Sequence, residues 1–326
     1  MVTARPGFAV WLCTPRCDRN CIHCYVRGRF SAELVTREAE KLIEEVSSLK
    51  PGFISVTGGE PLIRGDIFHL LEYARSMGVH VGIVTNGSLV NEEAAACLNE
   101  LDVHISLSFD AATKETCERI RGKSAWERAI AAARLLKENN VPLNPVMTVT
   151  SLNVHEAGDF VRFSADLGGD HASLIPLIPS GNAGVNLMPT PSSLASAIRS
   201  VEEAAEECGF YVSIWCTPFA QALVSSHYVH PGGCSDLSMD LDPLGNVLLC
   251  DVLDFKLGNI LEDGGKQAWR KMRSSQLYRE FKDASRLTGK CRECPLKPTC
   301  RGGCKARAYL THASFSAPDP LCPLPT

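Results

Sequence analysis

The sequence lacks the features of a membrane protein and of a nucleic-acid-binding protein. No run of about 18 uninterrupted apolar residues occurs, and the N-terminal residues Met1 to Pro6 contain no apolar signal-peptide segment. The charges nearly balance, with 33 Lys and Arg against 37 Asp and Glu, so no basic surface is expected for a nucleic-acid backbone or an anionic membrane. Low-complexity tracts and internal repeats beyond a βα unit are also missing. We therefore expect a soluble, cytoplasmic protein with no nucleic-acid and no membrane partner.

What the chain of 326 residues does contain is cysteine, at 15 positions. Its length and its hydrophobic fraction of 45% are sufficient for a substantial core, so disulfides are not needed to hold a small scaffold together. In a reducing compartment, an odd and large set of thiols is more typical of metal binding or catalysis. Clustered cysteines are therefore the first place to look for a site.

The first half of the chain alternates short β-rich runs with helical patterns, which indicates βα units around a parallel sheet. Amphipathic helices are predicted at residues 36–50 and 125–138, and another at about 192–208. Pro, Gly and Asn over residues 179–191 predict a long loop, and the βα pattern ends after Val212–Cys216. The predicted strands are Phe8–Leu12, Phe53–Thr57, Val81–Thr85, Val103–Phe109, Leu143–Val149 and Ser173–Ile178.

Polar residues alternate with apolar ones along the predicted strand Val103–Phe109. His104, Ser106 and Ser108 share one face, and the apolar residues on the other face would pack on helices. A closed barrel filled with Val and Ile does not need such a polar face, whereas an open, wide barrel that holds a polar ligand does. The same theme recurs more weakly at Ser55, Thr57, Thr148 and Thr150.

Three cysteines follow the first predicted strand with the spacing C-x3-C-x2-C: Cys17, Cys21 and Cys24. Three thiolates on one short loop can hold three corners of a cubane cluster, because thiolates are soft ligands suited to iron–sulfur centres. Cys13, four residues upstream, is a further ligand candidate. The alternative is a zinc site completed by His23, although zinc sites usually combine two C-x-x-C-type pairs.

This segment resembles the signature of the radical S-adenosylmethionine enzymes, a C-x3-C-x2-C loop that here ends in the aromatic residue Tyr25. Gly58-Gly59-Glu60-Pro61, after the second predicted strand, resembles the GGE segment of the same family. Both motifs lie at the carboxyl ends of successive strands, where barrel active sites are built. The resemblance implies an α/β fold, a partial (β/α)6 barrel over residues 1–210.

The resemblance also implies roles for individual residues. Cys17, Cys21 and Cys24 would bind three irons of a [4Fe-4S] cluster, and the fourth iron would bind S-adenosylmethionine. Gly58 and Gly59 would let the backbone approach the methionyl amino group, and Glu60 would supply a compensating charge or shape the turn. The implied cofactor contacts are Tyr25 at the adenine, Gly58, Gly59, Glu60 and Pro61, Thr85 and Asn86 at the ribose, and Ser108 at the methionine end.

Some of these implied positions have alternatives. Asn86-Gly87 is also a common turn dipeptide. Asp110-Ala111 stands where relatives often carry Asp-Gly, which leaves the turn and the role of Asp110 open. Arg119 and Arg121 could reach the carboxylate of the cofactor or be solvated.

Seven cysteines in the last third of the chain resemble the SPASM domain, which in its fullest form holds two auxiliary [4Fe-4S] clusters. The resemblance implies an inner cluster on Cys234, Cys250 and Cys304, and an outer cluster on Cys291, Cys294, Cys300 and Cys322. The fourth ligand of the inner cluster stays open between Cys216, a non-cysteine group and the substrate. A zinc ribbon would account for only four of the seven. We assign residues 211–326 to this loop-rich cluster domain.

The implied enzyme takes an electron from a low-potential donor such as ferredoxin or flavodoxin and cleaves S-adenosylmethionine. The resulting 5′-deoxyadenosyl radical abstracts a substrate hydrogen, and two auxiliary clusters favour net oxidation of the product. The resemblance also makes Asp251, directly after Cys250, the candidate general base, and the alternative is a capping or solvated aspartate. The main hypothesis is an oxidoreductase that matures a peptide or protein side chain. The alternatives are tetrapyrrole modification in alternative haem or haem d1 biosynthesis, and a non-enzymatic iron–sulfur electron carrier.

Overall fold

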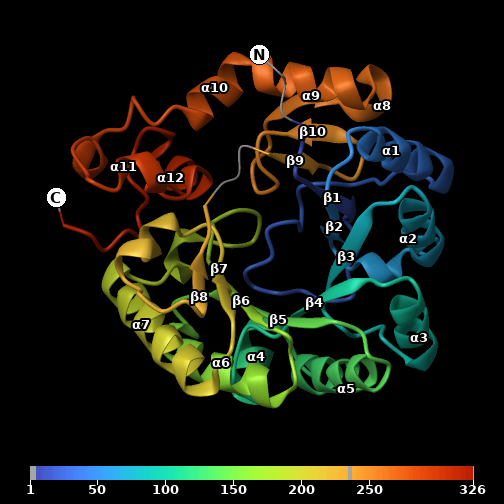
Figure 1. Ribbon diagram of the computed structural model, residues 1–326, viewed down its shortest axis with the longest axis horizontal. Coiled ribbons are helices and arrows are strands. Elements are labelled where there is room, and N and C mark those ends of the chain that lie inside the picture. Colours follow the sequence, from blue (N-terminus) through green and yellow to red (C-terminus); the bar gives the residue numbers. More distant parts are fainter. Residues whose placement is uncertain (1–4, 234–236, 326) are drawn as a thin grey trace.

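The computed structural model describes residues 5–233 and 237–325, in which a large, mostly parallel sheet runs through the molecule (Figure 1). The strands are β1 (Phe8–Thr14), β2 (Phe53–Gly58), β3 (His80–Thr85), β4 (His104–Ser108), β5 (Leu143–Val149), β6 (Ala172–Pro176), β7 (Val212–Ile214), β8 (Val229–Pro231), β9 (Ser238–Leu241), β10 (Asn246–Leu248) and β11 (Lys256–Asn259). β1 to β8 are consecutive parallel neighbours, and β9 pairs in parallel with the other side of β1. β10 and β11 complete this edge as antiparallel strands.

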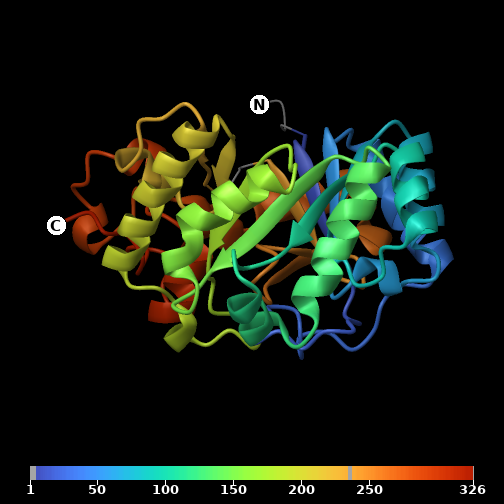
Figure 2. The same ribbon diagram turned by 90° about the horizontal axis from the view of Figure 1, so that it is seen from below.

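Helices cover the outer face of the sheet, as Figures 1 and 2 show. The first seven are α1 (Thr36–Ser48), α2 (Ile67–Ser76), α3 (Glu92–Glu100), α4 (Lys114–Arg121), α5 (Ala125–Glu138), α6 (Ala157–Asp166) and α7 (Pro191–Cys208). The C-terminal helices are α8 (Ile260–Asp263), α9 (Gly265–Ser274), α10 (Gln276–Lys282), α11 (Lys297–Cys300) and α12 (Lys305–His312). The six predicted strands and the three predicted helices are confirmed, with ends that differ by a few residues.

Local sequence signals set the ends of these elements. The Thr190 hydroxyl accepts a hydrogen bond from the Ser193 amide at 3.1 Å, and Pro191 then occupies the first turn of α7. The same helix ends at Gly209, which adopts the left-handed conformation that glycine tolerates best. The apolar faces of α1 and α5 lie in the core, as their spacing predicts.

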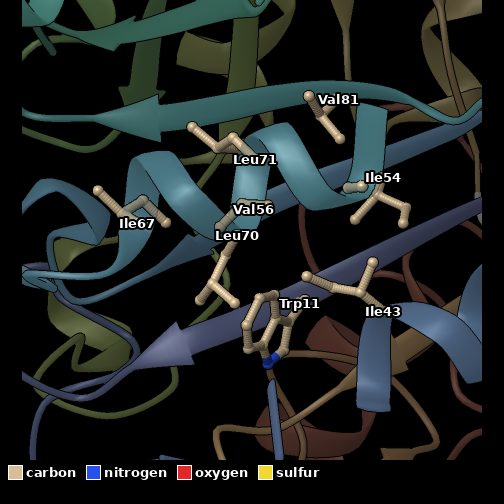
Figure 3. A pocket seen from close by; sticks show the side chains of 9 residues that line it. Trp11, Ile43, Ile54, Val56, Ile67, Leu70, Leu71 and Val81 are labelled. Carbon is tan, nitrogen blue, oxygen red and sulfur yellow. The ribbon is translucent and has the colours of Figure 1, made fainter. Parts of the chain in front are cut away.

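A small pocket lined by apolar side chains lies between β1, β2 and β3 and the helices α1 and α2 (Figure 3). Trp11 and Val56 from the strands meet Ile43 from α1 and Leu70 from α2, and each of these side chains is at most 3% exposed. Burying a side chain of this size contributes about 1.5–3 kcal/mol. This layer therefore fixes the strands whose carboxyl ends carry the cysteine loop and the Gly58-Gly59-Glu60-Pro61 segment.

The inner face of the sheet is polar, as the alternation in Val103–Phe109 predicts. Ile105 and Leu107 point into the apolar core, whereas Ser106 accepts a hydrogen bond from Asn144 Nδ2 at 3.2 Å. The same amide nitrogen donates to Ser173 Oγ at 3.1 Å. A polar layer thus joins β4, β5 and β6 inside the barrel.

The sheet continues across residue 211, because β7 and β8 extend it beyond β6. The C-terminal segment then contacts two separate parts of the molecule. Gly265 N donates to Glu45 Oε2 on α1 at 2.7 Å, and Gln221 Nε2 donates to Thr299 Oγ1 on α11 at 2.9 Å. The helices that follow β11 therefore contact α1 on one side and the turn that precedes β8 on the other. Among the described helices, none has the length and apolar character needed to cross a bilayer.

Candidate active site and cluster-binding cysteines

The C-x3-C-x2-C loop starts three residues after β1 and brings its three thiols together. Burial raises the pKa of Cys17 to about 11, and the neighbouring Cys21 adds to this rise. Burial also raises the pKa of Cys21, and Cys24 contributes in the same way. Thiols that are partly buried, unpaired and mutually close have the chemistry of a cluster site, since bound iron stabilises the thiolate form. The residues present therefore fit a cluster.

Cys13 lies on the opposite face of β1 from this site. It is fully buried in the apolar core against α1 and α2, and burial raises the pKa of its thiol well above the usual range. Its neighbour Leu12 packs on the other face, with Val26 of the cysteine loop. Strand alternation thus separates Cys13 from the loop thiols.

Asp110 joins the cysteine loop to the end of β4. Its carboxylate lies 3.0 Å from His23 Nε2, accepts a hydrogen bond from Arg121, and accepts another from the Thr148 amide at 2.6 Å. Burial opposes ionisation, yet His23 and Arg121 hold the pKa of Asp110 well below its usual range. Because His23 Nε2 is engaged by Asp110, the imidazole serves here as an anchor of the loop.

Arg121 is 8% exposed, so the solvated alternative for this arginine is wrong. Its carbonyl also lies 4.0 Å from Cys21 Sγ, and Ile22 N donates to Ile120 O at 3.1 Å. The end of α4 therefore borders the cysteine loop through main-chain atoms as well as through the Asp110 pair.

Gly58 and Gly59 allow β2 to approach the start of the cysteine loop closely. Gly59 N donates to Thr14 O at 2.7 Å, and Glu60 N donates to Arg16 O at 2.8 Å. A Cβ atom on Gly59 would lie 2.0 Å from Arg16 O, which is far inside van der Waals contact. The two glycines thus hold the chain that leads into Cys17, in addition to the cofactor role implied by the family resemblance.

Glu60 shapes the turn after β2, one of the two roles considered for it. Its fully buried carboxylate accepts hydrogen bonds from Leu62 N at 3.1 Å, Thr85 Oγ1 at 2.7 Å and Asn86 N at 2.8 Å. Burial raises the pKa of Glu60 to about 7, and these three donors oppose the rise. Pro61 is buried at the first position of the short 3-10 helix Pro61–Ile63. The Glu60 and Thr85 segments therefore form one hydrogen-bonded unit.

Asp18 connects that unit to the cysteine loop, a role that sequence patterns did not indicate. Its Oδ1 accepts from Asn86 Nδ2 at 2.9 Å, and its Oδ2 accepts from Ser88 Oγ at 2.6 Å. Asn86 Nδ2 also lies 3.9 Å from Cys17 Sγ. The position directly after Cys17 is the only sequence signal that could have singled out this aspartate.

Tyr25 contacts Asp251, one of two neighbouring carboxylates at Cys250. Its hydroxyl is hydrogen-bonded to Thr57 and to Asp251, and burial raises its pKa well above the usual range. The ligand atoms of Asp240, Cys250 and Asp251 lie within 4.8 Å of one another, and Asp240 Oδ2 accepts from Asp251 N at 3.0 Å. Burial raises the pKa of both carboxyl groups. Asp240, on β9, was not identified from the sequence, because its proximity to Asp251 depends on the β9–β10 pairing.

The four cysteines assigned to an outer cluster lie together near the C-terminus. Burial is the largest cause of the raised pKa of Cys291, to which Cys322 and Cys294 add. Burial also raises the pKa of Cys300 to about 11, with contributions from Cys322 and Cys291, while Gly302 and Gly303 donate backbone hydrogen bonds to its sulfur. Four convergent thiols are a complete ligand set for a cubane cluster.

The cysteines assigned to an inner cluster are only partly described. Cys234 lies outside the described residues. Cys250 is at the carboxylate pair described above, and Cys304 is the buried N-cap residue of α12.

Ser108, the predicted contact at the methionine end of the cofactor, is the last residue of β4 and lies on the inner face of the sheet.

The loop that follows β6 lies between the cysteine loop of Cys17 to Cys24 and the segment that follows Cys250. Asn182 N donates to Cys24 O at 2.8 Å, and Ser180 Oγ donates to Val252 O at 2.7 Å. Between them, Gly181 has φ +62°, and a Cβ atom there would lie 2.6 Å from Cys24 O. Three consecutive residues therefore contact both the cysteine loop and the segment after Cys250.

We expect Gly59→Ala to disturb the cysteine loop, because the new methyl group collides with the Arg16 carbonyl. The expected cost is about 1–3 kcal/mol of stability, as for other overpacking substitutions, together with reduced iron content. Thermal unfolding and iron analysis of the anaerobic protein measure both. Gly65→Ala is the matched control, since nothing lies within 4 Å of the added Cβ. Equal behaviour of the two variants would contradict the packing role of Gly59.

Comparison with known proteins identifies two family domains. The Radical SAM superfamily model matches residues 11–164, and the model of an iron-sulfur cluster-binding domain, SPASM, matches residues 234–295. The mycofactocin maturase MftC of Mycobacterium ulcerans is 30% identical over 97% of this chain and 88% of its own length. The AdoMet-dependent heme synthase of Methanosarcina barkeri is 27% identical over 98% of this chain and 97% of its own length.

Solved structures share the fold. Streptococcus suis SuiB, bound to its precursor peptide SuiA, superposes with a TM-score of 0.81 at 18% identity, over 98% of this chain and 76% of SuiB. The protein anSMEcpe with bound AdoMet gives a TM-score of 0.77 at 20% identity, over 97% of this chain and 91% of that protein. These likenesses confirm the α/β barrel with a loop-rich C-terminal region. The chain is a radical S-adenosylmethionine enzyme of the family that carries a SPASM iron–sulfur domain.

Proposed function

We propose that this enzyme oxidises a side chain of a peptide or protein, using S-adenosylmethionine and three [4Fe-4S] clusters. The observation that carries the proposal is the position of Asp251, which lies beside both Tyr25 of the cysteine loop and Cys250. The likeness to the mycofactocin maturase and to SuiB, which binds its precursor peptide SuiA, supports a peptide as the substrate. A substrate bound between the cysteine loop and Cys250 would lie close both to the proposed site of hydrogen abstraction and to the proposed auxiliary cluster that oxidises the product.

The proposed cofactor site lies at the carboxyl ends of the first strands. Cys17, Cys21 and Cys24 hold the catalytic cluster, and bound S-adenosylmethionine supplies the radical that removes a hydrogen atom from the substrate. Gly58, Gly59, Glu60 and Pro61 form the wall beside it, with Thr85 and Asn86 fixed by Glu60. Tyr25 and Ser108 complete the proposed cofactor contacts. A low-potential ferredoxin or flavodoxin is the proposed electron donor.

Asp251 is the proposed acceptor of the proton that leaves as the substrate is oxidised. The Arg29 guanidinium donates to the Asp251 carbonyl at 2.8 Å, which fixes the backbone, and the Tyr25 hydroxyl orients the carboxylate. In the proposed division of the chain, residues 1–210 position the cofactor, and residues 211–326 bring Asp251 and the auxiliary clusters to the substrate.

For Asp251→Asn, we expect 5′-deoxyadenosine formation close to that of the parent and at least a tenfold loss of oxidised product, the usual scale for loss of a general base. The amide keeps the shape of the side chain and cannot accept the proton. Liquid chromatography of the same reaction measures the ratio of oxidised product to 5′-deoxyadenosine. Asp159→Asn, an exposed carboxylate on α6, is the control. Unchanged product formation in the Asp251 variant would return this residue to a structural role.

Anaerobic reconstitution should give about 12 iron and 12 sulfide per chain if three cubane clusters form. The four convergent thiols of the outer site and the three of the cysteine loop support two of these clusters directly. Iron and sulfide analysis, with absorption spectra before and after chelation, measures the number of clusters per chain. A value near four would contradict the presence of two auxiliary clusters.

The substrate class is tested by product mass. We expect a short peptide encoded beside the gene to lose two hydrogen atoms, or an equivalent oxidised fragment, when it is co-expressed with the enzyme. Tetrapyrrole modification is the second candidate, because the heme synthase relative matches over nearly the full length of both chains. Incubation with sirohaem-derived tetrapyrroles tests it. Turnover of the tetrapyrrole with no change in the peptide would overturn the peptide proposal.

A further inference from the structure

A carboxylate of the cysteine loop is hydrogen-bonded to the loop between β3 and α3. Asp18 Oδ1 accepts from Asn86 Nδ2 at 2.9 Å, and Asp18 Oδ2 accepts from Ser88 Oγ at 2.6 Å. The two donors lie 68 and 70 positions later in the chain. Asp18 thus joins two segments that are distant in the sequence, whereas an aspartate that only shapes its own turn bonds to backbone a few residues away.

These contacts determine which end of the Asn86 side chain faces the cysteine loop. An ionised carboxylate only accepts hydrogen bonds, and a backbone N–H only donates them. The amide nitrogen of Asn86 must therefore face Asp18, while Asn86 Oδ1 accepts from Ser88 N at 2.8 Å. The reversed amide would place N–H groups opposite the Ser88 N–H and an oxygen opposite the carboxylate. One of the two possible orientations of this amide is thereby selected.

The backbone of Asn86 is fixed separately from its side chain. Asn86 N donates to Glu60 Oε2 at 2.8 Å, and the residue is only 7% exposed. Its Nδ2 also lies 3.9 Å from Cys17 Sγ, a longer and weaker contact than the bond to Asp18. The Asp18 carboxylate is therefore the stronger of these two partners of the amide nitrogen, and its loss would free the side chain without releasing the backbone.

The selected orientation leaves an acceptor at the position that family resemblance assigns to the ribose. An amide oxygen has two lone pairs, and on Asn86 Oδ1 the Ser88 amide uses one of them. A ribose hydroxyl can donate to the other. The reversed amide would instead present N–H groups there. The contacts of Asp18 thus favour the chemistry that a sugar hydroxyl needs from Asn86.

We propose that Asp18 is a positioning residue for S-adenosylmethionine, which orients Asn86 so that its amide oxygen accepts a hydrogen bond from a ribose hydroxyl. The inference rests on the proposed cofactor site and adds Asp18 to it, with Ser88 as its partner. Asp18 acts through Asn86 and does not touch the reacting atoms. Because Asp18 directly follows Cys17, the ribose contact is tied to the loop that holds the catalytic cluster.

The test measures binding of S-adenosylmethionine to the reconstituted full chain, under anaerobic conditions and without a reductant, so that no turnover occurs. Asp18→Ala should raise the dissociation constant about tenfold, the scale of one lost hydrogen bond. Asp18→Asn should stay within about threefold of the unmodified enzyme, because an amide oxygen at this position still accepts from Asn86 Nδ2. Iron content should equal that of the unmodified enzyme in both variants.

Cofactor analogues separate positioning from a general loosening of the loop. S-adenosylmethionine that lacks the 2′- or the 3′-hydroxyl should bind more weakly to the unmodified enzyme. For at least one of the two analogues, this loss should disappear in Asp18→Ala, since the hydroxyl no longer has an oriented acceptor. In an Asn86→Ala background, Asp18→Ala should have no further effect, because Asp18 acts on the cofactor through Asn86.

Asp159→Ala, which removes an exposed carboxylate on α6, is the matched control and should bind S-adenosylmethionine as the unmodified enzyme does. Four results would overturn the positioning role of Asp18. These are equal weakening of S-adenosylmethionine and both analogues by Asp18→Ala, a further loss in the Asn86→Ala background, an Asp18→Asn variant as weak as Asp18→Ala, and a drop in iron content. Failure of the unmodified enzyme to bind S-adenosylmethionine would instead refute the proposed cofactor site.

Discussion

We expect replacement of Cys17, Cys21 and Cys24 with Ala to abolish the formation of 5′-deoxyadenosine from S-adenosylmethionine. The three thiols lie on the loop that follows β1, where Cys21 neighbours both Cys17 and Cys24, and alanine offers no ligand atom to iron. Iron content should fall by about four per chain, the content of one cubane cluster. The fold should persist, since Asp110 still anchors the loop through His23 and the Gly59 contacts remain. Chromatographic assay of 5′-deoxyadenosine under reducing, anaerobic conditions measures the loss.

The control for this experiment is the double variant Cys97→Ala and Cys208→Ala. Cys97 is half-buried and Cys208 is exposed, and neither belongs to the three cysteine groups. Its activity and iron content should match those of the unmodified enzyme. Persistence of 5′-deoxyadenosine in the triple variant would rule out the catalytic assignment of the loop.

Asp319→Asn is expected to destabilise the enzyme by about 3–5 kcal/mol, the scale for breaking a buried ion pair. Both partners of the Arg307–Asp319 pair are fully buried, so the substitution leaves the guanidinium charge without a counter-charge. Cys304 also loses a charged acceptor for its amide. Chemical unfolding of the reconstituted protein should show a lower midpoint, and iron content should fall if the inner site is disturbed.

An exposed ion pair on the surface is the control for the buried Arg307–Asp319 pair. Arg162 and Glu207 form a salt bridge at 2.6 Å with side chains 40% and 61% exposed. Glu207→Ala should change stability by about 1 kcal/mol or less, because solvent screens such pairs. A similar shift in the two variants would show that the Arg307–Asp319 pair does not stabilise the C-terminal segment against the barrel.

The barrel strands could be predicted because each is a local pattern. Phe53–Thr57 and Leu143–Val149, for example, appear in the structure as β2 and β5 with nearly the same ends. The strands that flank this set are different, since β7 and β9 have only three or four residues and little pattern of their own. Their pairing depends on β6 and β1, which are distant in the sequence. Tertiary contacts, rather than local propensity, determine these elements.

The candidate site likewise contains residues that local sequence patterns predict and residues that only long-range contacts bring together. The spacing of Cys17, Cys21 and Cys24 is a local signal, and the structure brings these thiols together. The contact of Cys216 with Cys304 and that of Asp240 with Asp251 depend on the path of the chain between the members of each pair. The effect of Asp110-Ala111 could not be inferred either, because Asp110 adopts φ +61° without a glycine after it and is held by Arg121 and His23. Long-range hydrogen bonds replace the flexibility that a glycine would have provided.

The three residues Ser180 to Asn182 link the cysteine loop to the segment that follows Cys250. They are hydrogen-bonded at one end to the backbone of Cys24 and at the other to Val252, two residues after Cys250. A large displacement of the cysteine loop relative to the segment after Cys250 would therefore disturb these bonds or the close backbone contact of Gly181. In the proposed reaction, this link would keep hydrogen abstraction near the cysteine loop and proton removal at Asp251 at a constant separation.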